Sequence, residues 1–204
     1  MTRTDILNML IRKHGYDSYL ELGLGSLSNF QQVKIKYRQG VDKSWYEFYG
    51  ENDRFWLGTT DDFFNHVDLL TTKMFDLIFI DADHRYHRSC RDIFRSFGLL
   101  KDGGTMVLHD VLPKNVREAI PKKENNSNAW CGEVWRNWVE FRRFKNVVSY
   151  VVNTDHGCGI LQRGENTKPF IGVSPKTAFD YIGAYGPDSY HNIVSPKYFN
   201  ELHV

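Results

Sequence analysis

Two kinds of apolar pattern alternate along the chain. In the first, apolar side chains recur every three or four residues, which is typical of amphipathic helices. This pattern covers the amino-terminal segment as far as His14 and the ranges 28–36, 60–67, 91–100 and 133–144. In the second, short runs rich in apolar residues predict strands, and the least interrupted of them, at 75–80, is typical of a strand buried on both faces of a parallel sheet. These runs lie near 19–22, 40–42, 55–57, 75–80, 105–108, 147–152 and 159–161.

The alternation of strands and helices predicts the fold class. Strands joined by helices form right-handed βαβ units, so we expect an α/β, Rossmann-like, doubly wound and mostly parallel sheet. The runs above give it seven strands. Residues 153–157, Asn-Thr-Asp-His-Gly, predict a hairpin turn that adds an antiparallel strand near the carboxyl terminus. A chain of 204 residues predicts a single domain, with a core at 1–163 and a packed tail at 164–204.

Acidic residues mark the predicted strand ends. Ligands of doubly wound sheets bind beyond the carboxyl ends of the strands. Acids stand near five of these ends: Glu21, Asp42, Asp61, Asp81 and Asp110. The first strand is followed by a glycine turn that contains Gly23 and Gly25. Glycine there permits positive φ and a close ligand approach, and the next helix offers free backbone N–H groups. The pattern indicates a ligand site along this edge of the sheet.

With these motifs the chain resembles the class I S-adenosylmethionine-dependent methyltransferases. YLELGLGS looks like their first motif, GVD their second and LGTTDDFF their adenine-contacting segment. FDLIFIDADHRYHRSCRDI and LLKDGGTMVLHDV look like the motifs of the fourth and fifth strands. The resemblance covers about residues 4–163 and is closest to the subfamily that contains macrolide-sugar O-methyltransferases. One departure is Ser26, where many members carry a third glycine.

The resemblance implies an enzyme that moves a methyl group from S-adenosylmethionine to a hydroxyl of a small molecule, sugar or glycan. Glu21 would lie near the methionine part of the cofactor, and Asp42 would hold the ribose hydroxyls. Asp81 would lie near the methyl donor. The full set of cofactor-binding residues that it implies is Glu21, Gly23, Gly25, Asp42, Thr60, Asp61 and Asp81, with Thr60 and Asp61 at the adenine edge.

A neutral hydroxyl acceptor needs a base or a metal, because its own pKa lies far above neutrality. The resemblance implies His84 as the proton acceptor, with His109 and Asp110 shaping the acceptor site. The alternative is that His84 only anchors its loop by bonding a backbone carbonyl. The macrolide-sugar relatives hold magnesium with an acid at the Asp81 position and an acid pair after the fifth strand. Here His109 replaces one carboxylate, which disfavours magnesium.

A divalent metal near Asp81 and Asp110 therefore stays an open alternative, with Mn²⁺ or another ion that accepts nitrogen ligands as the candidate. No residue is assigned as a metal ligand. The three cysteines, Cys90, Cys131 and Cys158, form no CxxC pair, so neither a disulfide scaffold nor a structural zinc site is expected. His156 sits in the predicted hairpin turn, where it either reaches the rim of the site or serves the turn alone.

Two other classes of function compete with this interpretation. A nicotinamide-dependent oxidoreductase would also carry a glycine turn, but its G-x-G-x-x-G pattern fails here at Ser28. A non-catalytic binding module could use the same fold. The 26 basic and 25 acidic residues give a formal charge of +1, which disfavours a nucleic-acid partner, and no apolar run is long enough to span a membrane. We expect a cytoplasmic protein with a small-molecule or glycan acceptor, and a homodimer is compatible with its aromatic tail.

Overall fold

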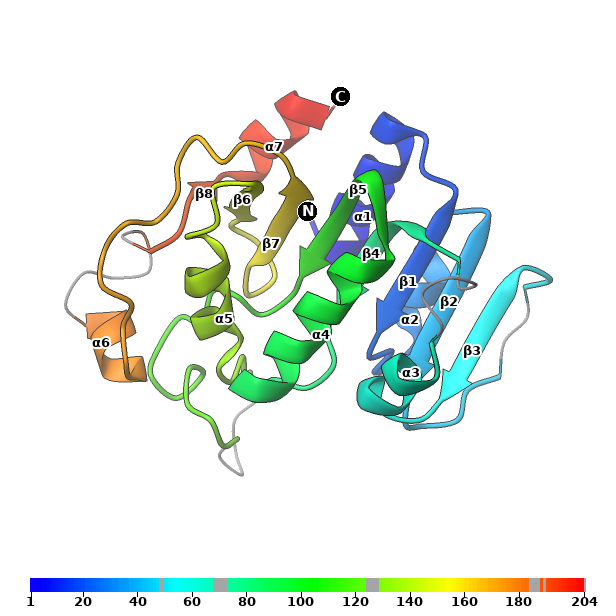
Figure 1. Cartoon of the computed structure of the whole chain (residues 1–204), viewed down its shortest axis with the longest axis horizontal. Helices are drawn as coiled ribbons and strands as arrows, with labels where there is room; N and C mark the ends of the chain where they lie inside the picture. The colour runs from blue at the N-terminus through cyan, green and yellow to red at the C-terminus, as the bar shows by residue number, and fades with distance from the viewer. Residues whose placement is uncertain (48–49, 68–72, 124–128, 184–187, 189, 204) are drawn as a thin grey trace.

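The computed structural model describes residues 1–47, 50–67, 73–123, 129–183, 188 and 190–203. Within these residues one sheet of eight strands runs through the molecule in the order β3-β2-β1-β4-β5-β7-β6-β8 (Figure 1). The strands are β1 Ser18–Leu22, β2 Tyr37–Asp42, β3 Asp53–Leu57, β4 Phe75–Ile80, β5 Leu100–Leu108, β6 Val147–Val152, β7 Cys158–Arg163 and β8 Ile193–Val194. The first five are parallel, and β7 is antiparallel to β5 and β6. The predicted doubly wound fold is confirmed.

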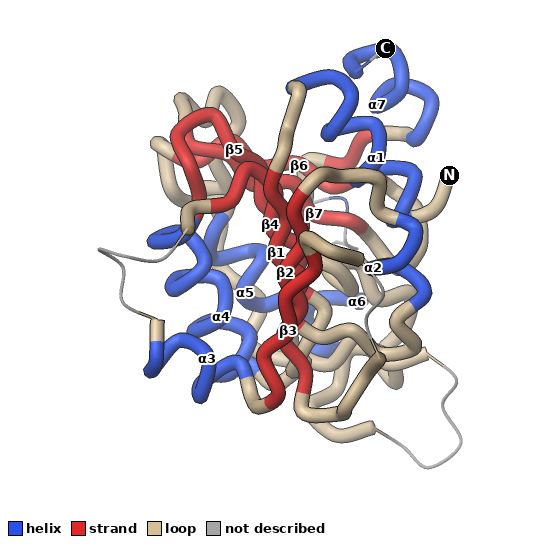
Figure 2. The backbone as a smooth tube through the Cα atoms, turned by 90° about the vertical axis from the view of Figure 1, so that its right-hand side faces the viewer, coloured by secondary structure: helices blue, strands red, loops and turns tan. Residues whose placement is uncertain are grey.

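Helices cover both faces of this sheet. The helices are α1 Arg3–His14, α2 Ser28–Gln32, α3 Thr60–His66, α4 Tyr86–Leu99, α5 Val134–Phe141, α6 Ala178–Gly183 and α7 Pro196–His203. Figure 2 shows α3, α4 and α5 on one face and α1, α2 and α7 on the other. Each face has its own apolar core, and the strands contribute alternate side chains to both. Among the described residues, no helix has the length and apolar character needed to cross a membrane.

The helix boundaries follow from local capping. Thr2 and Asp5 form a capping box at the start of α1, and Gly15 ends the helix in the left-handed conformation. Thr59 and Asp62 form a second capping box at the start of α3. A helix starts within a few residues of the carboxyl ends of β1, β3 and β4, so these helix starts lie along one edge of the sheet.

The sequence pattern placed several boundaries wrongly. Helix α4 begins at Tyr86, not Arg91, because its first turn is mostly polar and carries no apolar spacing. Strand β5 begins at Leu100, upstream of the expected turn at 102–104, and an irregular register against β4 accommodates these exposed residues. Helix α2 stops at Gln32, where the chain becomes extended.

The carboxyl-terminal segment contacts the rest of the fold at several places. β8 pairs with β6 and adds an eighth strand that two residues are too few to reveal in the sequence. Tyr181 of α6 stacks on Trp135 of α5 with ring centroids 4.3 Å apart. Trp135 and Trp138 are buried core residues, as their helical spacing indicates. The polar loop expected at 121–128 lies partly outside the described residues, at 124–128.

Candidate functional site

The turn after β1 contains two glycines, Gly23 and Gly25, and the physical reason for a glycine differs between the two positions. Gly23 has φ +85°, and a Cβ there would lie 2.2 Å from the carbonyl oxygen of Asp81, so only glycine lets β1 and β4 approach this closely. Gly25 has φ +53°, and a Cβ there would meet no atom within 4 Å. The turn therefore leaves an open backbone surface at Gly25, where a ligand can approach.

Asp42 at the end of β2 holds this turn in place. One carboxylate oxygen accepts the N–H of Leu24 over 2.8 Å, and the other accepts the N–H of Ser44 over 2.8 Å. The Tyr46 hydroxyl donates to the carbonyl of Gly25 over 2.6 Å. The carboxylate is partly exposed and has lone pairs beyond those used by the two amides. The Asp42 carboxylate can therefore still accept hydrogen bonds from the hydroxyl groups of a ligand.

Glu21 lies beneath the glycine turn and is 1% exposed. Its carboxyl group accepts the Tyr19 hydroxyl over 2.7 Å and the Asn29 amide over 3.2 Å. Thr4 of α1 in turn donates to Asn29 over 2.8 Å, so the network joins α1, β1 and α2. Burial raises the pKa of Glu21 to about 8, although its two hydrogen bonds act in the opposite direction.

Thr60 and Asp61, expected at the adenine edge, both engage α4. The Asp61 carboxylate pairs with the guanidinium groups of Arg88, Arg91 and Arg95, the last two at 3.0 and 3.3 Å. Burial raises the pKa of Asp92 in α4 to about 6, and the Thr60 side chain acts in the opposite direction. These contacts anchor α3 on α4. The adenine-edge role of the two residues stays a prediction.

The predicted catalytic residues meet at the carboxyl ends of β4 and β5. His84 Nδ1 donates to the Trp130 carbonyl over 2.9 Å, since a carbonyl can only accept. His84 Nε2 then lies 3.3 Å from Asp81 Oδ1 and 3.4 Å from Asp110 Oδ2. The backbone anchor considered as an alternative is therefore present, and it leaves the second ring nitrogen facing the site.

His109 lies on the other side of these carboxylates. Its Nδ1 is 3.4 Å from Asp81 Oδ1 and 3.4 Å from Asp110 Oδ1. Its Nε2 is 3.5 Å from Asp155 Oδ2. The imidazole is 5% exposed and is thus enclosed by three acids.

Sequence reasoning missed two residues of this cluster, Arg3 and Asp155. The Arg3 guanidinium is 3.1 Å from both Asp81 Oδ2 and the ring nitrogens of His109, and 3.5 Å from Asp155. Arg3 stands in the first turn of α1, where the helix dipole disfavours positive charge. An arginine in the first turn of a predicted helix was the signal for Arg3 in the sequence, but such arginines are too common to identify a site.

The cluster balances three acids, Asp81, Asp110 and Asp155, against Arg3 and two imidazoles. Burial lowers the pKa of both His84 and His109, but the neighbouring carboxylates outweigh it and raise both values, that of His109 well above its ordinary range. Burial would raise the pKa of Asp81, but hydrogen bonds from the two imidazoles hold it well below normal. The site is therefore a network of mutually stabilised charges.

Backbone strain concentrates at the same place. Among the described residues, four that are not glycine have positive φ: Leu27, Asp110, Asp155 and His156. The last three, at +59°, +49° and +59°, lie after β5 and in the turn between β6 and β7. Such conformations cost on the order of 1–3 kcal/mol each and cluster at functional sites.

A cavity of about 410 Å³ opens beside this turn. Its walls come from residues 112–114, from the turn at 153–157, and from Asp188 and Ile193. Lys114, Asp155 and His156 give the walls a polar and charged character. The cavity adjoins the charged cluster through Asp155, which belongs to both.

Comparisons with known proteins agree on one fold. A crystal structure of a candidate caffeoyl-CoA O-methyltransferase from Staphylococcus aureus superposes with a TM-score of 0.61 at 18% identity, covering 79% of this chain and 82% of that one. The O-methyltransferase TomG from Streptomyces achromogenes, involved in tomaymycin synthesis and solved with S-adenosylmethionine, gives 0.59 at 14% identity and 79% of each chain. An O-methyltransferase from Bacillus cereus, solved with S-adenosylhomocysteine, gives 0.58 at 15% identity, covering 81% and 82%.

No curated protein matches the sequence. A family profile described as a methyltransferase domain matches residues 10–111, which is half of the chain. The matched segment contains the glycine turn, Asp42, Asp81, His84 and the end of β5 at His109 and Asp110. The chain therefore belongs to this methyltransferase-domain family, and its fold is that of the class I S-adenosylmethionine-dependent methyltransferases.

Proposed function

We propose that this methyltransferase transfers the methyl group of S-adenosylmethionine to a hydroxyl of a small molecule, sugar or glycan. The observation that carries the proposal is the edge of the sheet where an open glycine turn, the Asp42 carboxylate and an imidazole between two carboxylates lie together. The structural neighbours described as O-methyltransferases support a hydroxyl acceptor.

The residues around the glycine turn fit the cofactor. The open surface at Gly25 admits a ligand against the backbone, Asp42 offers acceptors for ribose hydroxyls, and Glu21 lies beneath the turn for the methionine end. The cofactor supplies an already activated methyl group, so the protein has to orient the acceptor and remove its proton.

The first prediction concerns Asp42. The unfolding temperature of the protein should rise with S-adenosylmethionine or S-adenosylhomocysteine and stay unchanged with NAD. Asp42→Ala should weaken cofactor binding by about 1–3 kcal/mol, measured by calorimetry, because a charged hydrogen-bond partner is lost. Asp42→Asn keeps one acceptor and should lose less, while Asp102→Ala, at a fully exposed side chain, should bind normally. A thermal response to NAD alone would contradict the proposal.

His84 is the proposed base. The Trp130 carbonyl holds the proton on Nδ1, so His84 acts as a base from its neutral form, in which Nε2 carries the lone pair. Burial lowers the pKa of His84, but Asp81 and Asp110 outweigh it and raise the value, so this neutral form becomes more populated as the pH rises. The acceptor hydroxyl would give its proton to Nε2 as its oxygen takes the methyl group. Asp81 and Asp110 stabilise the imidazolium that forms, and His109 with Arg3 holds those two carboxylates in place.

The charged cluster around Asp81 and Asp110 is a poor match for a magnesium site. Magnesium prefers an all-oxygen shell, but His109 stands where the relatives have a carboxylate, and the Arg3 guanidinium lies 3.1 Å from Asp81 Oδ2. Two oxygens and one imidazole, from Asp81, Asp110 and His84, lie close enough together to share an ion. Because Arg3 and His109 already place positive charge against these carboxylates, we propose no magnesium-dependent step.

The second prediction tests the base. His84→Gln should leave S-adenosylhomocysteine affinity nearly unchanged and lower turnover by on the order of 10²–10⁴, the usual contribution of general acid–base catalysis. His87→Gln is the matched control, since His87 is exposed at the start of α4. Wild-type turnover in the His84 variant would rule out the base, and lost cofactor binding would indicate a structural role.

The polar cavity beside Asp155 is where we expect the acceptor to bind, so candidate sugars and phenols are the substrates to screen first.

A further inference from the structure

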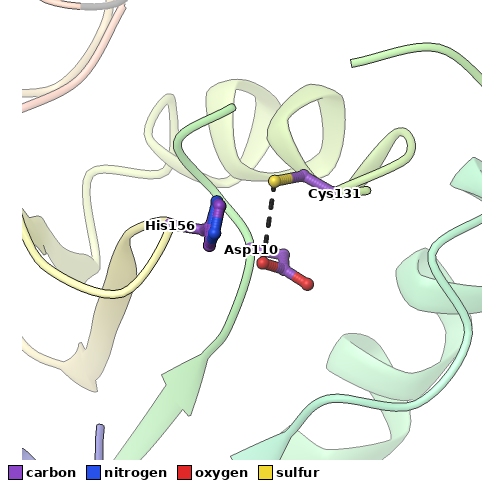
Figure 3. Close-up of side chains that lie close together, drawn as sticks. All are labelled: Asp110, Cys131 and His156. Carbon is purple, nitrogen blue, oxygen red and sulfur yellow. Dashed lines mark hydrogen bonds between the residues drawn. The ribbon is translucent and has the colours of Figure 1, made fainter. Parts of the chain in front are cut away.

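A cysteine, a histidine and a carboxylate from three separate segments converge on one side of Asp110. The donor atoms of Asp110, Cys131 and His156 all lie within 4.8 Å of one another (Figure 3). Cys131 precedes α5, Asp110 follows β5, and His156 lies in the turn between β6 and β7. This set shares Asp110 with the proposed proton-transfer site, whereas Cys131 and His156 have no part in that transfer.

We propose that these three side chains form a binding site for a zinc-class divalent cation. Thiolate, imidazole and carboxylate together are the donors that zinc prefers, whereas magnesium and calcium take oxygen. Donor atoms around tetrahedral zinc lie roughly 3.3–3.8 Å apart, given bonds of about 2.0–2.3 Å. The Cys131 Sγ to Asp110 Oδ1 distance is 3.6 Å, which already matches this spacing.

A second, independent observation points to a ligand here. His156 Nδ1 is buried and has no hydrogen-bond partner, which is costly for a polar atom unless something binds it. The nearest acid to it is Glu118, with Oε2 at 3.8 Å. Glu118 is itself 9% exposed and is oriented by the Lys114 backbone and the Asn115 side chain at 2.8 Å each. This adds another negative charge beside the cluster, which favours a bound cation.

The backbone holds the three donors in position before any ion binds. The N–H groups of Cys131 and Gly132 both donate to the Glu118 carbonyl over 3.0 Å. The His156 carbonyl accepts the N–H of Leu112 over 2.8 Å, which ties the hairpin turn to the segment that follows β5. Little conformational entropy is therefore left to lose on binding, and three protein donors leave the fourth tetrahedral position open.

The chemistry of binding is a simple exchange. When the ion binds, the thiol proton of Cys131 is released to solvent, and the sulfur becomes a thiolate ligand. Asp110 would contribute Oδ1 on this side while Oδ2 remains 3.4 Å from His84 Nε2. The ion would thus act as a positioning element that fixes Asp110, and through it His84, while tying three loops together.

The test uses the full chain, stripped with a chelator and titrated with Co²⁺, a spectroscopic substitute for Zn²⁺. We expect one ion per chain, a thiolate-to-cobalt charge-transfer absorption, and displacement of the cobalt by Zn²⁺ but not by Mg²⁺. Cys131→Ser should abolish the charge-transfer absorption, and His156→Gln should weaken binding by at least about 10-fold, since even loss of an outer-shell partner costs 10–100-fold. Cys158→Ser is the matched control, because Cys158 is equally buried but lies outside the set.

Zn²⁺ should also raise the unfolding temperature of the wild type and of Cys158→Ser but not of Cys131→Ser. The absence of Co²⁺ binding would overturn the proposal. So would cobalt absorption without a thiolate contribution, or a thiolate band that survives Cys131→Ser. None of these readouts requires methyl transfer, so they stay informative if the proposed function fails.

Discussion

Glu21 carries an acidic group that the fold almost completely encloses. Its pKa is raised by burial from 4.5 to about 8, so the folded state keeps a proton that the unfolded chain loses. The stability associated with the protonated form is therefore fully present below pH 4.5 and is lost as the pH rises towards 8. The loss can reach about 1.4 kcal/mol per pH unit inside that window.

We expect Glu21→Gln to remove this pH dependence. In denaturant unfolding without cofactor at several pH values from about 5 to 8, which lie inside the window given by the raised pKa, the wild type should lose stability relative to the variant as the pH rises. Glu51→Gln, at an exposed turn, should follow the wild type. Parallel curves for wild type and Glu21→Gln would show that the carboxyl group ionises freely in the folded protein.

At the scale of elements, the loop before α5 depends on a close approach to the loop after β4. Gly132 has φ +61°, and a Cβ there would lie 2.5 Å from the His84 carbonyl. The Glu133 N–H donates to that same carbonyl over 2.7 Å. The loop that carries Trp130 and Cys131 is thus seated directly on the His84 loop.

Gly132→Ala should consequently destabilise the protein more than backbone strain alone accounts for. Gly103→Ala is the matched control, since Gly103 has φ +77° but open space around its Cβ position. The control should lose about 1–2 kcal/mol from the left-handed conformation, and Gly132→Ala should lose clearly more because of the collision. If the two variants lose the same free energy of unfolding, the loop before α5 can move away from the His84 loop at little cost.

Over the whole molecule, we propose that the chain folds as one domain that includes residues 164–204. The Trp135–Tyr181 stack, the Arg142 guanidinium bonded to the Tyr190 carbonyl over 2.8 Å, and the pairing of β8 with β6 all join this segment to the rest. Such buried contacts couple the stability of the tail to that of the sheet.

Tyr181→Ala should then lower the unfolding temperature of the entire protein. Removing a buried aromatic ring costs about 3 kcal/mol or more, which corresponds to roughly 6 °C or more for a chain of this size. Phe179→Ala in the same helix removes a ring that is 73% exposed and should have little effect. Circular dichroism and tryptophan fluorescence should report one coincident transition, and an early separate transition of the tail would contradict the single domain.

Local patterns in the sequence were sufficient for the main frame of the fold. The apolar run at Phe75–Ile80 and the acids after it predict a buried strand and its ligand-facing end, because both depend on neighbours a few residues away. The glycine turn was visible for the same reason. The starts of α4 and β5 were not, because a polar first turn and an irregular register leave no apolar period.

What only the tertiary structure decided are the contacts between distant segments. Arg3 reaches His109 across 106 positions, Asp61 meets three arginines of α4, and Cys131 meets Asp110 and His156. The three cysteines in sequence argued against a zinc site, since spacing along the chain reveals only ligands that are neighbours in it. Separate loops carry these donors, and the parallel sheet brings them to one edge because its strands end there together.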